Sequence, residues 1–268
     1  MRTVNGRTEL RPDDGPLVAV VGVFDGLHLG HAYLLEHLVA EAREREARPT
    51  VITFDAHPDA VLLGHAPPLL MDPVERLDRL AVAGVEVVVV EHFDDALRRT
   101  PYDVFVAGIT SRCRLAALVM TPDAAFGHER AGTPATLAEL GRHARFEVVV
   151  VPPFALDGRE IRSSDIRAAI ASGDLGTAER LLGRPYAVIG DVDATGRMSF
   201  AMPVALPPPG TYEVRTPRGR TAMVGPDGST SIGAGRAEMR IRVEFAGSSP
   251  AATSTQRANA GGQAPAID

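Results

Sequence analysis

The chain has 268 residues, of which 45% are hydrophobic and 23% charged, so it can build one large or two modest domains with a substantial core. Its formal net charge of −6 at pH 7 argues against a dominant nucleic-acid footprint, and its one cysteine, Cys113, excludes an internal disulfide framework. The N-terminal residues have no apolar signal core, and no run approaches the ~18 apolar residues that span a bilayer. We therefore expect a cytoplasmic protein with neither a membrane nor a nucleic acid as its partner. All 28 basic residues are arginine, so an anion site must use arginine, histidine or backbone N–H groups.

The chain opens with two contrasting segments. Residues 1–16 are polar and carry Pro and Gly, which predicts a flexible lead-in. Residues 17–23 form an unbroken, valine-rich apolar run, which is typical of a strand buried on both faces of a parallel sheet. After a turn through residues 24–26, apolar residues recur at helical spacing, which predicts a helix that ends near Arg48, just before Pro49.

Strand and helix alternate from residue 17 to residue 151. Further strands are predicted at residues 50–54, 85–90, 114–120 and 146–151, and helices after Asp72, after Thr100 or Pro101, and at residues 136–143. This alternation predicts a parallel sheet with helices on both faces, which binds ligands at the carboxyl edge of its strands. Two more helices are predicted, one within residues 161–172 with Ser163, Ser164 or Asp165 as its cap, and one at residues 177–182.

The composition changes after Tyr186. Short strand candidates at residues 186–192, 212–215, 221–224 and 239–245 alternate with Gly- and Pro-bearing turns, which predicts a small antiparallel β module. From Ser248 onward the chain is dominated by Ala, Ser, Thr, Gly, Pro and Gln, which predicts a disordered tail. The predicted organisation is a lead-in at 1–16, an α/β domain at 17–186, the β module at 187–247 and the tail at 248–268.

Two histidines, His28 and His31, flank Gly30 where the first helix is predicted to begin. A helix start offers backbone N–H groups and the positive end of the helix dipole, which suits a phosphate. Gly30 would leave room for an anion to approach the backbone, and both histidines would lie on one face and could donate to the same phosphate oxygens. A lone histidine here would more often bind a local carbonyl, but two at this spacing favour an anion site. No Cys or carboxylate follows at the spacing that zinc needs, so we assign no metal ligand.

Residues 22–31, Gly-Val-Phe-Asp-Gly-Leu-His-Leu-Gly-His, resemble the start of the adenylyltransferase half of the prokaryotic bifunctional riboflavin kinase/FAD synthetase family. Residues 53–58, 123–132, 161–167 and 183–186 are similar, in the same order, to its second loop, flavin-side loop, serine-rich ATP loop and domain junction. The resemblance covers residues 17–247. It implies a Rossmann-like nucleotidyltransferase domain followed by a shortened riboflavin-kinase-like β module.

The resemblance also implies the reaction, transfer of AMP from ATP to FMN with release of pyrophosphate, and it implies Mg²⁺ bound together with ATP. The implied catalytic residues are His28, His31 and Arg167. The implied ATP-binding residues are Gly22, Phe24, Asp25, Gly26, His28, Gly30, His31, Arg162, Ser163, Ser164 and Arg167. On the flavin side the implied residues are His57, Pro58, Asp123 and Phe126.

The chain also departs from the family's pattern. Arg162 stands where the family has a serine, and Thr121 and Ala124 replace the glycine and phenylalanine of the flavin-side loop. Residues 196–205 lack the Thr-Ala-Asn of the kinase signature, so oxygen ligands for Mg²⁺ are missing and we expect riboflavin kinase activity to be lost. Two alternatives stay open: a nucleotidyltransferase for another phosphorylated acceptor or a modified flavin, and a non-catalytic protein that binds flavin or nucleotide.

Overall fold

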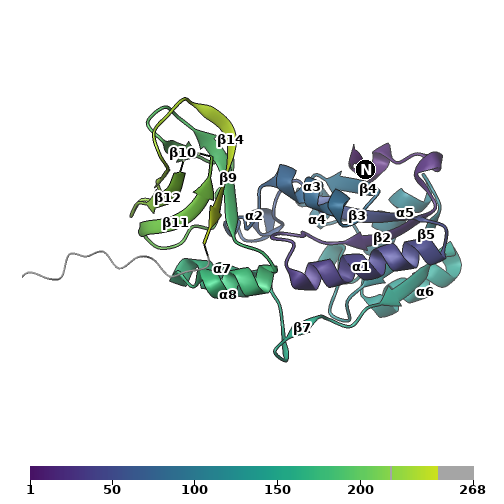
Figure 1. Ribbon diagram of the computed structural model, residues 1–268. Coiled ribbons are helices and arrows are strands. Elements are labelled where there is room, and N and C mark those ends of the chain that lie inside the picture. Colours follow the sequence, from purple (N-terminus) through teal and green to yellow (C-terminus); the bar gives the residue numbers. More distant parts are fainter. Residues whose placement is uncertain (218, 247–268) are drawn as a thin grey trace, which may run out of the picture.

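The computed structural model describes residues 1–217 and 219–246, so the tail predicted at residues 248–268 lies outside the described residues. The described chain has an α/β part, built on a six-stranded sheet, and a C-terminal barrel beside it (Figure 1). The predicted parallel sheet flanked by helices and the predicted antiparallel β module are therefore both confirmed.

The sheet has the strand order β1-β4-β3-β2-β5-β6, and every neighbouring pair is parallel. Its strands are β1 (Arg2–Asn5), β2 (Leu17–Val21), β3 (Arg48–Phe54), β4 (Val87–Glu91), β5 (Leu115–Met120) and β6 (Glu147–Val150). The chain builds one side of the sheet outward from β2 and then crosses to β5 on the other side. In open α/β sheets, ligands bind in the crevice at such a switch point, outside the carboxyl ends of the strands.

Helices cover both faces of the sheet. On one face lie α1 (Leu29–Glu44) and α3 (Pro73–Val82), and on the other lie α5 (Tyr102–Thr110) and α6 (Pro134–Ala144). Their buried side chains explain this placement, since Leu38 and Leu80 join the cluster around Val20, whereas Phe105 and Leu137 join the cluster around Leu118 on the opposite face. Shorter helical segments are α2 (Asp59–Leu62), α4 (Asp95–Arg98), η1 (Arg7–Glu9), η2 (Pro12–Asp14) and η3 (His128–Arg130).

The C-terminal strands close into a barrel in the order β10-β13-β12-β11-β14-β9. They are β9 (Ala187–Val192), β10 (Arg197–Ser199), β11 (Gly210–Thr216), β12 (Gly219–Val224), β13 (Thr230–Ser231) and β14 (Glu238–Phe245). A hairpin of β7 (Ala155–Leu156) and β8 (Arg159–Glu160) leads from the sheet to α7 (Ser163–Ser172) and α8 (Leu175–Leu182). These two helices lie beneath the barrel in Figure 1, and Ile166 and Leu182 share one hydrophobic cluster with Phe245. The core of the barrel thus begins before the domain boundary predicted at Tyr186.

The structure corrects two predictions near the N-terminus. The flexible lead-in predicted at residues 1–16 is wrong, because Arg2–Asn5 form β1 and extend the sheet beside β4. Only Val4 of this strand is buried, so apolar patterning does not reveal it. The first helix ends at Glu44 rather than near Arg48, since Glu46 adopts a positive φ of 49° and β3 already begins at Arg48.

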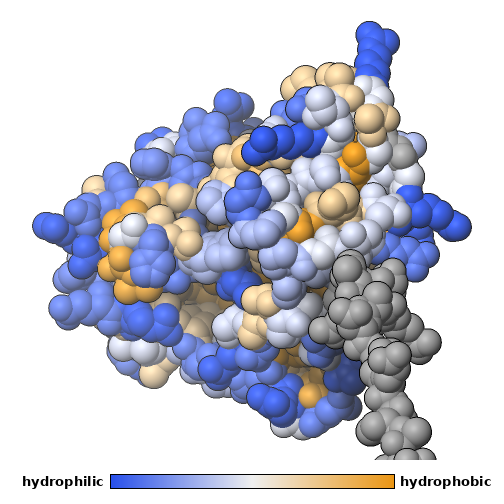
Figure 2. Space-filling view, turned by 90° about the vertical axis from the view of Figure 1, so that its left-hand side faces the viewer, coloured by the Kyte–Doolittle hydropathy of each residue, from blue (hydrophilic) through white to orange (hydrophobic). Residues whose placement is uncertain are grey.

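Within residues 1–217 and 219–246, no helix is both long enough and apolar enough to cross a membrane. Figure 2 shows one face of the molecule, on which hydrophobic residues lie in separate small groups among hydrophilic ones. Exposed apolar residues scattered in this way need no partner to explain them.

Candidate active site

A cavity of about 840 Å³ opens at the carboxyl edge of the sheet, at the switch point between β2 and β5. Five strands contribute residues at or just beyond their carboxyl ends: residues 20–24 after β2, Phe54 from β3, Phe93 after β4, residues 118–121 from β5, and residues 153–154 after β6. The strands are parallel, so these ends meet at one edge of the sheet.

Most of the sequence-predicted site residues line this cavity. They are Gly22, Phe24, His28, Gly30, His31, Pro58, Asp123, Phe126, Arg162 and Ser163. Five other predicted residues do not line it: Asp25, Gly26, His57, Ser164 and Arg167. The cavity therefore joins the predicted phosphate side to the predicted flavin side, while part of the predicted set lies outside it.

His28 and His31 lie side by side at the start of α1. His28 is the N-cap residue, and its Nδ1 accepts a hydrogen bond from the His31 backbone N–H at 3.3 Å. A neutral imidazole that accepts at Nδ1 carries its proton on Nε2, so His28 keeps Nε2–H as a donor. The two rings stack with their centroids 3.8 Å apart and their planes inclined by 18°.

Gly30 makes room for the His28 ring. A Cβ at position 30 would lie 3.1 Å from both Cε1 and Nδ1 of His28, which is tighter than an ordinary contact. Gly30 also lines the cavity, and the room that it would leave for an anion stays a prediction. The absence of a side chain at Gly30 leaves the space that the His28 ring needs in its observed position.

Both histidines are neutral donors at neutral pH. Burial, with the nearby Arg184 cation, lowers the pKa of His28 from 6.5 to about 4. Burial and the adjacent His28 lower the pKa of His31 well below 6.5. Nδ1 of His31 is buried and has no hydrogen-bond partner among the described residues. Buried polar atoms are normally paired, so this unpaired nitrogen is an exception within the part of the chain that the structure describes.

The buried Asp25 and the half-buried Arg167 form an ion pair outside the cavity, with Nη2 and Oδ2 2.5 Å apart. The Asp25 carboxylate also accepts from the Leu70 N–H, and Nε of Arg167 donates to the Pro68 carbonyl at 2.8 Å. Burial raises the pKa of Asp25, and Arg167 and the Leu70 N–H oppose this rise. Arg167 is thus committed to Asp25 and Pro68 rather than aimed into the cavity, and its catalytic role stays a prediction.

The start of α7 differs from the prediction. Its N-cap residue is Arg162, and no side chain makes a capping bond there, so none of the caps predicted at residues 163–165 is used. The Ser163 hydroxyl instead donates to the Asp25 carbonyl at 3.2 Å, while Ser164 is exposed.

His57 lies at the start of α2 rather than in the cavity wall. Its Nδ1 accepts from the Asp59 N–H at 3.2 Å, and burial lowers its pKa from 6.5. Pro58, the next residue, does line the cavity.

Two arginines outside the predicted set bind the carbonyl groups behind the cavity. Arg184 donates to the carbonyls of Gly26 and Leu27, and Arg76 donates to those of Val23 at 3.0 Å and Phe54 at 2.8 Å. Backbone acceptors carry no signature in a sequence. Arg184 does lie within residues 183–186, which are similar to the family's domain junction, whereas Arg76 lies in none of the similar segments.

The part of the chain that the structure describes contains no group of three or more His, Cys, Asp or Glu side chains that could hold a metal ion. Asp25, the carboxylate of the loop after β2, is engaged with Arg167 and Leu70.

Residues 10–165 match the family model described as FAD synthetase. The chain belongs to the FAD synthetase family. It is 36% identical over 174 residues to the bifunctional riboflavin kinase/FMN adenylyltransferase of Haemophilus influenzae, covering 64% of this chain and 56% of that protein. It is 32% identical over 191 residues to the protein of the same name from Escherichia coli K12, covering 69% of this chain and 61% of that protein. The matched region thus spans about three fifths of the length of these curated relatives.

A solved structure titled as a macrolide-efflux protein from Streptococcus pneumoniae is similar to the whole fold. The TM-score is 0.75 at 23% sequence identity, and the similarity covers 91% of this chain and 88% of that one. At this identity the likeness shows a shared fold only. The similarity extends over the barrel, which lies outside the residues 10–165 that match the FAD synthetase model.

Proposed function

We propose that this member of the FAD synthetase family is an FMN adenylyltransferase, which transfers AMP from ATP to FMN and releases pyrophosphate. The observation that carries the proposal is the stacked, neutral pair His28 and His31 in the cavity at the switch point of the sheet. The relatives named FMN adenylyltransferase match this chain over its α/β part, which supports the same activity here.

In the proposed reaction, an oxygen of the FMN phosphate attacks the α-phosphorus of ATP, and the bond from that phosphorus to the bridging oxygen breaks. Such phosphoryl chemistry needs positioning and charge stabilisation more than covalent help from the protein. His28 donates from Nε2–H, and the neighbouring His31 donates from a ring N–H, to oxygens of the ATP phosphates. As negative charge gathers there, it raises the pKa of each imidazole, so the pair can take up a proton when charge develops.

The flavin side of the cavity is apolar and aromatic. Phe54 and Phe93 meet edge to face with their ring centroids 5.1 Å apart, and Phe126 lies 5.4 Å from Phe105 in the same wall. Aromatic walls suit the flat ring system of a flavin. Arg162, exposed at the N-cap of α7, is placed to meet the departing pyrophosphate, whereas Arg167 would first have to leave Asp25.

We further propose that Mg²⁺ reaches the cavity bound to the ATP phosphates and water. A hard cation of this kind commonly binds substrate phosphates with few protein ligands. The residues described above supply hydrogen-bond donors and arginine charges, and no step of the proposed reaction is assigned to a protein-bound metal.

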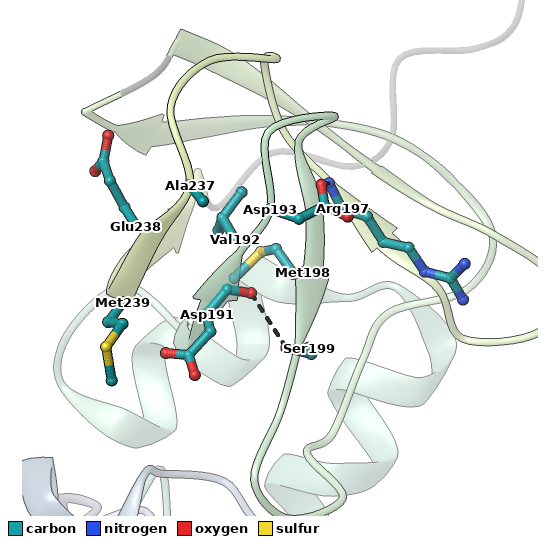
Figure 3. Close-up of a pocket in the computed structure, with 9 residues that line it drawn as sticks. All are labelled: Asp191, Val192, Asp193, Arg197, Met198, Ser199, Ala237, Glu238 and Met239. Atoms are coloured by element: carbon teal, nitrogen blue, oxygen red, sulfur yellow. Dashed lines mark hydrogen bonds between the residues drawn. The ribbon is translucent and has the colours of Figure 1, made fainter.

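We also propose that the barrel lacks riboflavin kinase activity. A hollow of about 340 Å³ in the barrel is lined by residues from β9, β10 and the start of β14 (Figure 3). Asp193, at its wall, accepts from the N–H groups of Thr195 and Arg197, so its carboxylate already stabilises the turn between β9 and β10. Residues 203–205 form two backbone hydrogen bonds with Leu69 of the α/β part. The Leu69 N–H donates to the Pro203 carbonyl, and the Ala205 N–H donates to the Leu69 carbonyl. These contacts give that segment a structural task in place of the kinase signature.

The proposed activities are tested together with the purified full chain. With FMN, ATP and Mg²⁺ it should form FAD and pyrophosphate in equal amounts, and with riboflavin and ATP it should form no FMN. Riboflavin phosphorylation would overturn the proposed loss of the kinase.

A second candidate is adenylyl transfer to a different phosphorylated acceptor or a modified flavin. The observation that favours it is Ala124, a small side chain in the cavity wall on the flavin side. A comparison of kcat/KM across FMN, modified flavin phosphates and other phosphorylated metabolites decides between the two acceptors. If no acceptor turns over although flavin or nucleotide binds, the non-catalytic alternative is supported.

A further inference from the structure

The loop that would hold the ATP phosphates, residues 24–28, has a backbone that needs outside support. Phe24, Gly26 and Leu27 all have positive φ, at 53°, 79° and 40°. For residues other than glycine this region of φ is strained, and it persists only where surrounding structure holds it. Two of the three are not glycine, so contacts behind the loop must stabilise it.

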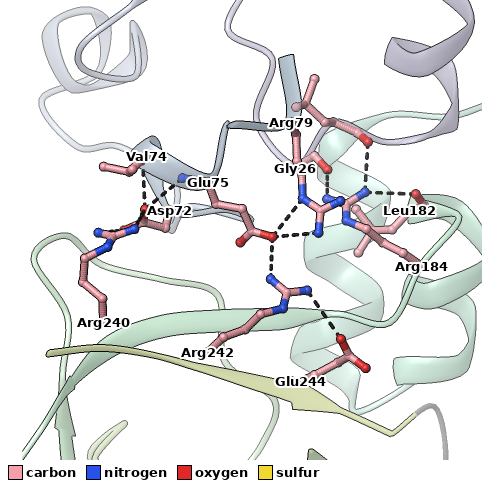
Figure 4. Close-up of polar contacts among 11 residues, drawn as sticks. Gly26, Asp72, Val74, Glu75, Arg79, Leu182, Arg184, Arg240, Arg242 and Glu244 are labelled. Carbon is pink, nitrogen blue, oxygen red and sulfur yellow. Dashed lines mark hydrogen bonds and ion pairs between the residues drawn. The ribbon is translucent and has the colours of Figure 1, made fainter. Parts of the chain in front are cut away.

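Arg184 provides such contacts. It follows directly after α8, and its guanidinium donates to the carbonyls of Leu27 at 3.0 Å, Gly26, and Leu182 at 3.1 Å (Figure 4). One planar fork therefore holds two consecutive peptide groups of the loop and ties them to the end of α8, which packs on the barrel. Burial lowers the pKa of Arg184 to about 10, which leaves it a cation at neutral pH.

The direction of these carbonyls sets the direction of the neighbouring N–H groups. In a trans peptide, C=O and N–H point to opposite sides, so turning the carbonyls of Gly26 and Leu27 toward Arg184 turns the N–H groups of Leu27 and His28 away from it. The Ser163 hydroxyl, bound to the Asp25 carbonyl, has the same effect on the Gly26 N–H. None of these three N–H groups donates to an acceptor within the described residues. Of these three residues only His28 lines the cavity, so the held carbonyls act on the ligand side through the placement of His28.

We infer that Arg184 is a positioning residue for the phosphate loop: by holding the carbonyls of Gly26 and Leu27 it fixes the strained backbone that carries His28 into the cavity, and so sets where His28 meets the ATP phosphates. The inference rests on the proposed adenylyltransferase function. It also gives the barrel a task, because α8 and the barrel share one core and Arg184 joins that core to the loop.

Other arginines at the same junction supply a matched control. Arg240 on β14 binds the carboxylate of Asp72 at the start of α3, and Arg242 binds Glu75 (Figure 4). Both join the barrel to the α/β part without touching the phosphate loop. Arg240→Ala therefore removes a cation and an interface contact while leaving the Gly26 and Leu27 carbonyls held by Arg184.

The experiment compares the full-length wild-type chain with Arg184→Gln, Arg184→Lys and Arg240→Ala. FAD formation gives kcat and the separate KM values for ATP and FMN, and calorimetry gives the affinity for ATP in the absence of FMN. For Arg184→Gln we expect kcat/KM for ATP to fall about 100-fold, the magnitude of a small misplacement of reacting groups, with KM for FMN changed less than about twofold. Arg184→Lys keeps the charge but not the fork, so it should fall between Arg184→Gln and wild type. Arg240→Ala should behave as wild type.

An increase in KM for FMN as large as the increase in KM for ATP in Arg184→Gln would overturn the inference. Wild-type kinetics of Arg184→Gln, or an equal loss of kcat/KM for ATP in Arg240→Ala, would also overturn it. If Arg184→Gln does not fold, Arg184→Lys carries the same comparison. If the wild type makes no FAD, the proposed function fails, but the calorimetric comparison of ATP affinity still decides the role of Arg184.

Discussion

Substituting Gly30 by alanine tests whether the placement of the His28 ring controls activity. The new Cβ would lie 3.1 Å from Cε1 and Nδ1 of His28, so the ring must move by a few tenths of an ångström. The ring has little freedom to do so, because it stacks on His31 and its Nδ1 caps α1. We therefore expect Gly30→Ala to displace the imidazole or to break the capping bond.

The two effects on stability nearly cancel. Losing an N-cap bond costs about 0.5–2 kcal/mol, whereas alanine in place of glycine inside a helix gains about 1 kcal/mol. The free energy of unfolding should therefore change by no more than about 1 kcal/mol. Catalysis has no such compensation, since a displaced donor fails to meet the phosphate oxygens, and kcat/KM for FAD formation should fall on the order of 100-fold.

The assay measures FAD formation and urea unfolding for wild type, Gly30→Ala and the control Gly210→Ala. A Cβ at Gly210 would meet Tyr212 at 3.5 Å, an ordinary contact, and Gly210 lies in β11 of the barrel, far along the chain from His28. The control should keep wild-type activity. Full activity of Gly30→Ala, or an equal loss in Gly210→Ala, would refute the reasoning.

Three further predictions follow from the ionisable groups. Folding lowers the pKa of His28 from 6.5 to about 4, so between these two pH values the unfolded chain binds more protons than the folded chain. The free energy of unfolding should therefore fall by roughly 3 kcal/mol as the pH drops from 6.5 to about 4. Urea unfolding of His28→Gln should show a weaker pH slope, and an unchanged slope would contradict the assignment. ATP phosphates beside the two histidines should raise the pKa values of both imidazoles, so ATP binding near pH 6 should be accompanied by proton uptake. Calorimetry in buffers of different ionisation enthalpy measures the number of protons taken up. Net proton release on ATP binding would contradict the prediction. Asp25→Asn leaves the half-buried Arg167 without its carboxylate and should cost up to about 3 kcal/mol in urea unfolding. The double variant Asp25→Leu with Arg167→Met should recover most of this loss, and an equal loss in the double variant would argue against the coupling.

Long apolar runs and helix caps made much of the α/β part predictable. The run at residues 17–23 forms the central strand β2, and Asp72 caps α3 by accepting from Val74 and Glu75 N–H groups. Strands with few residues or one buried side chain escape such patterns, as β1, β10 and β13 show. The closure of the barrel depends on β10 and β13. The apolar patterns therefore predicted an antiparallel module but not its closed form.

The candidate site was predictable where residues lie close in the chain and follow the ends of strands. Its support was not, because it depends on contacts between distant positions. Arg184 reaches the Leu27 carbonyl across 157 residues, and Arg167 reaches Asp25 across 142. The first contact has a backbone acceptor, which any residue could supply. The second withdraws Arg167 from the cavity, a competition between two partners that spacing in a sequence does not reveal.

The most direct test of the central claim is a single incubation of the purified full chain with FMN, ATP and Mg²⁺, followed by separation of the flavins and assay of pyrophosphate. The account predicts FAD and pyrophosphate in a one-to-one ratio and loss of both products in His28→Ala. Absence of FAD at high enzyme concentration, or undiminished turnover by His28→Ala, would contradict it.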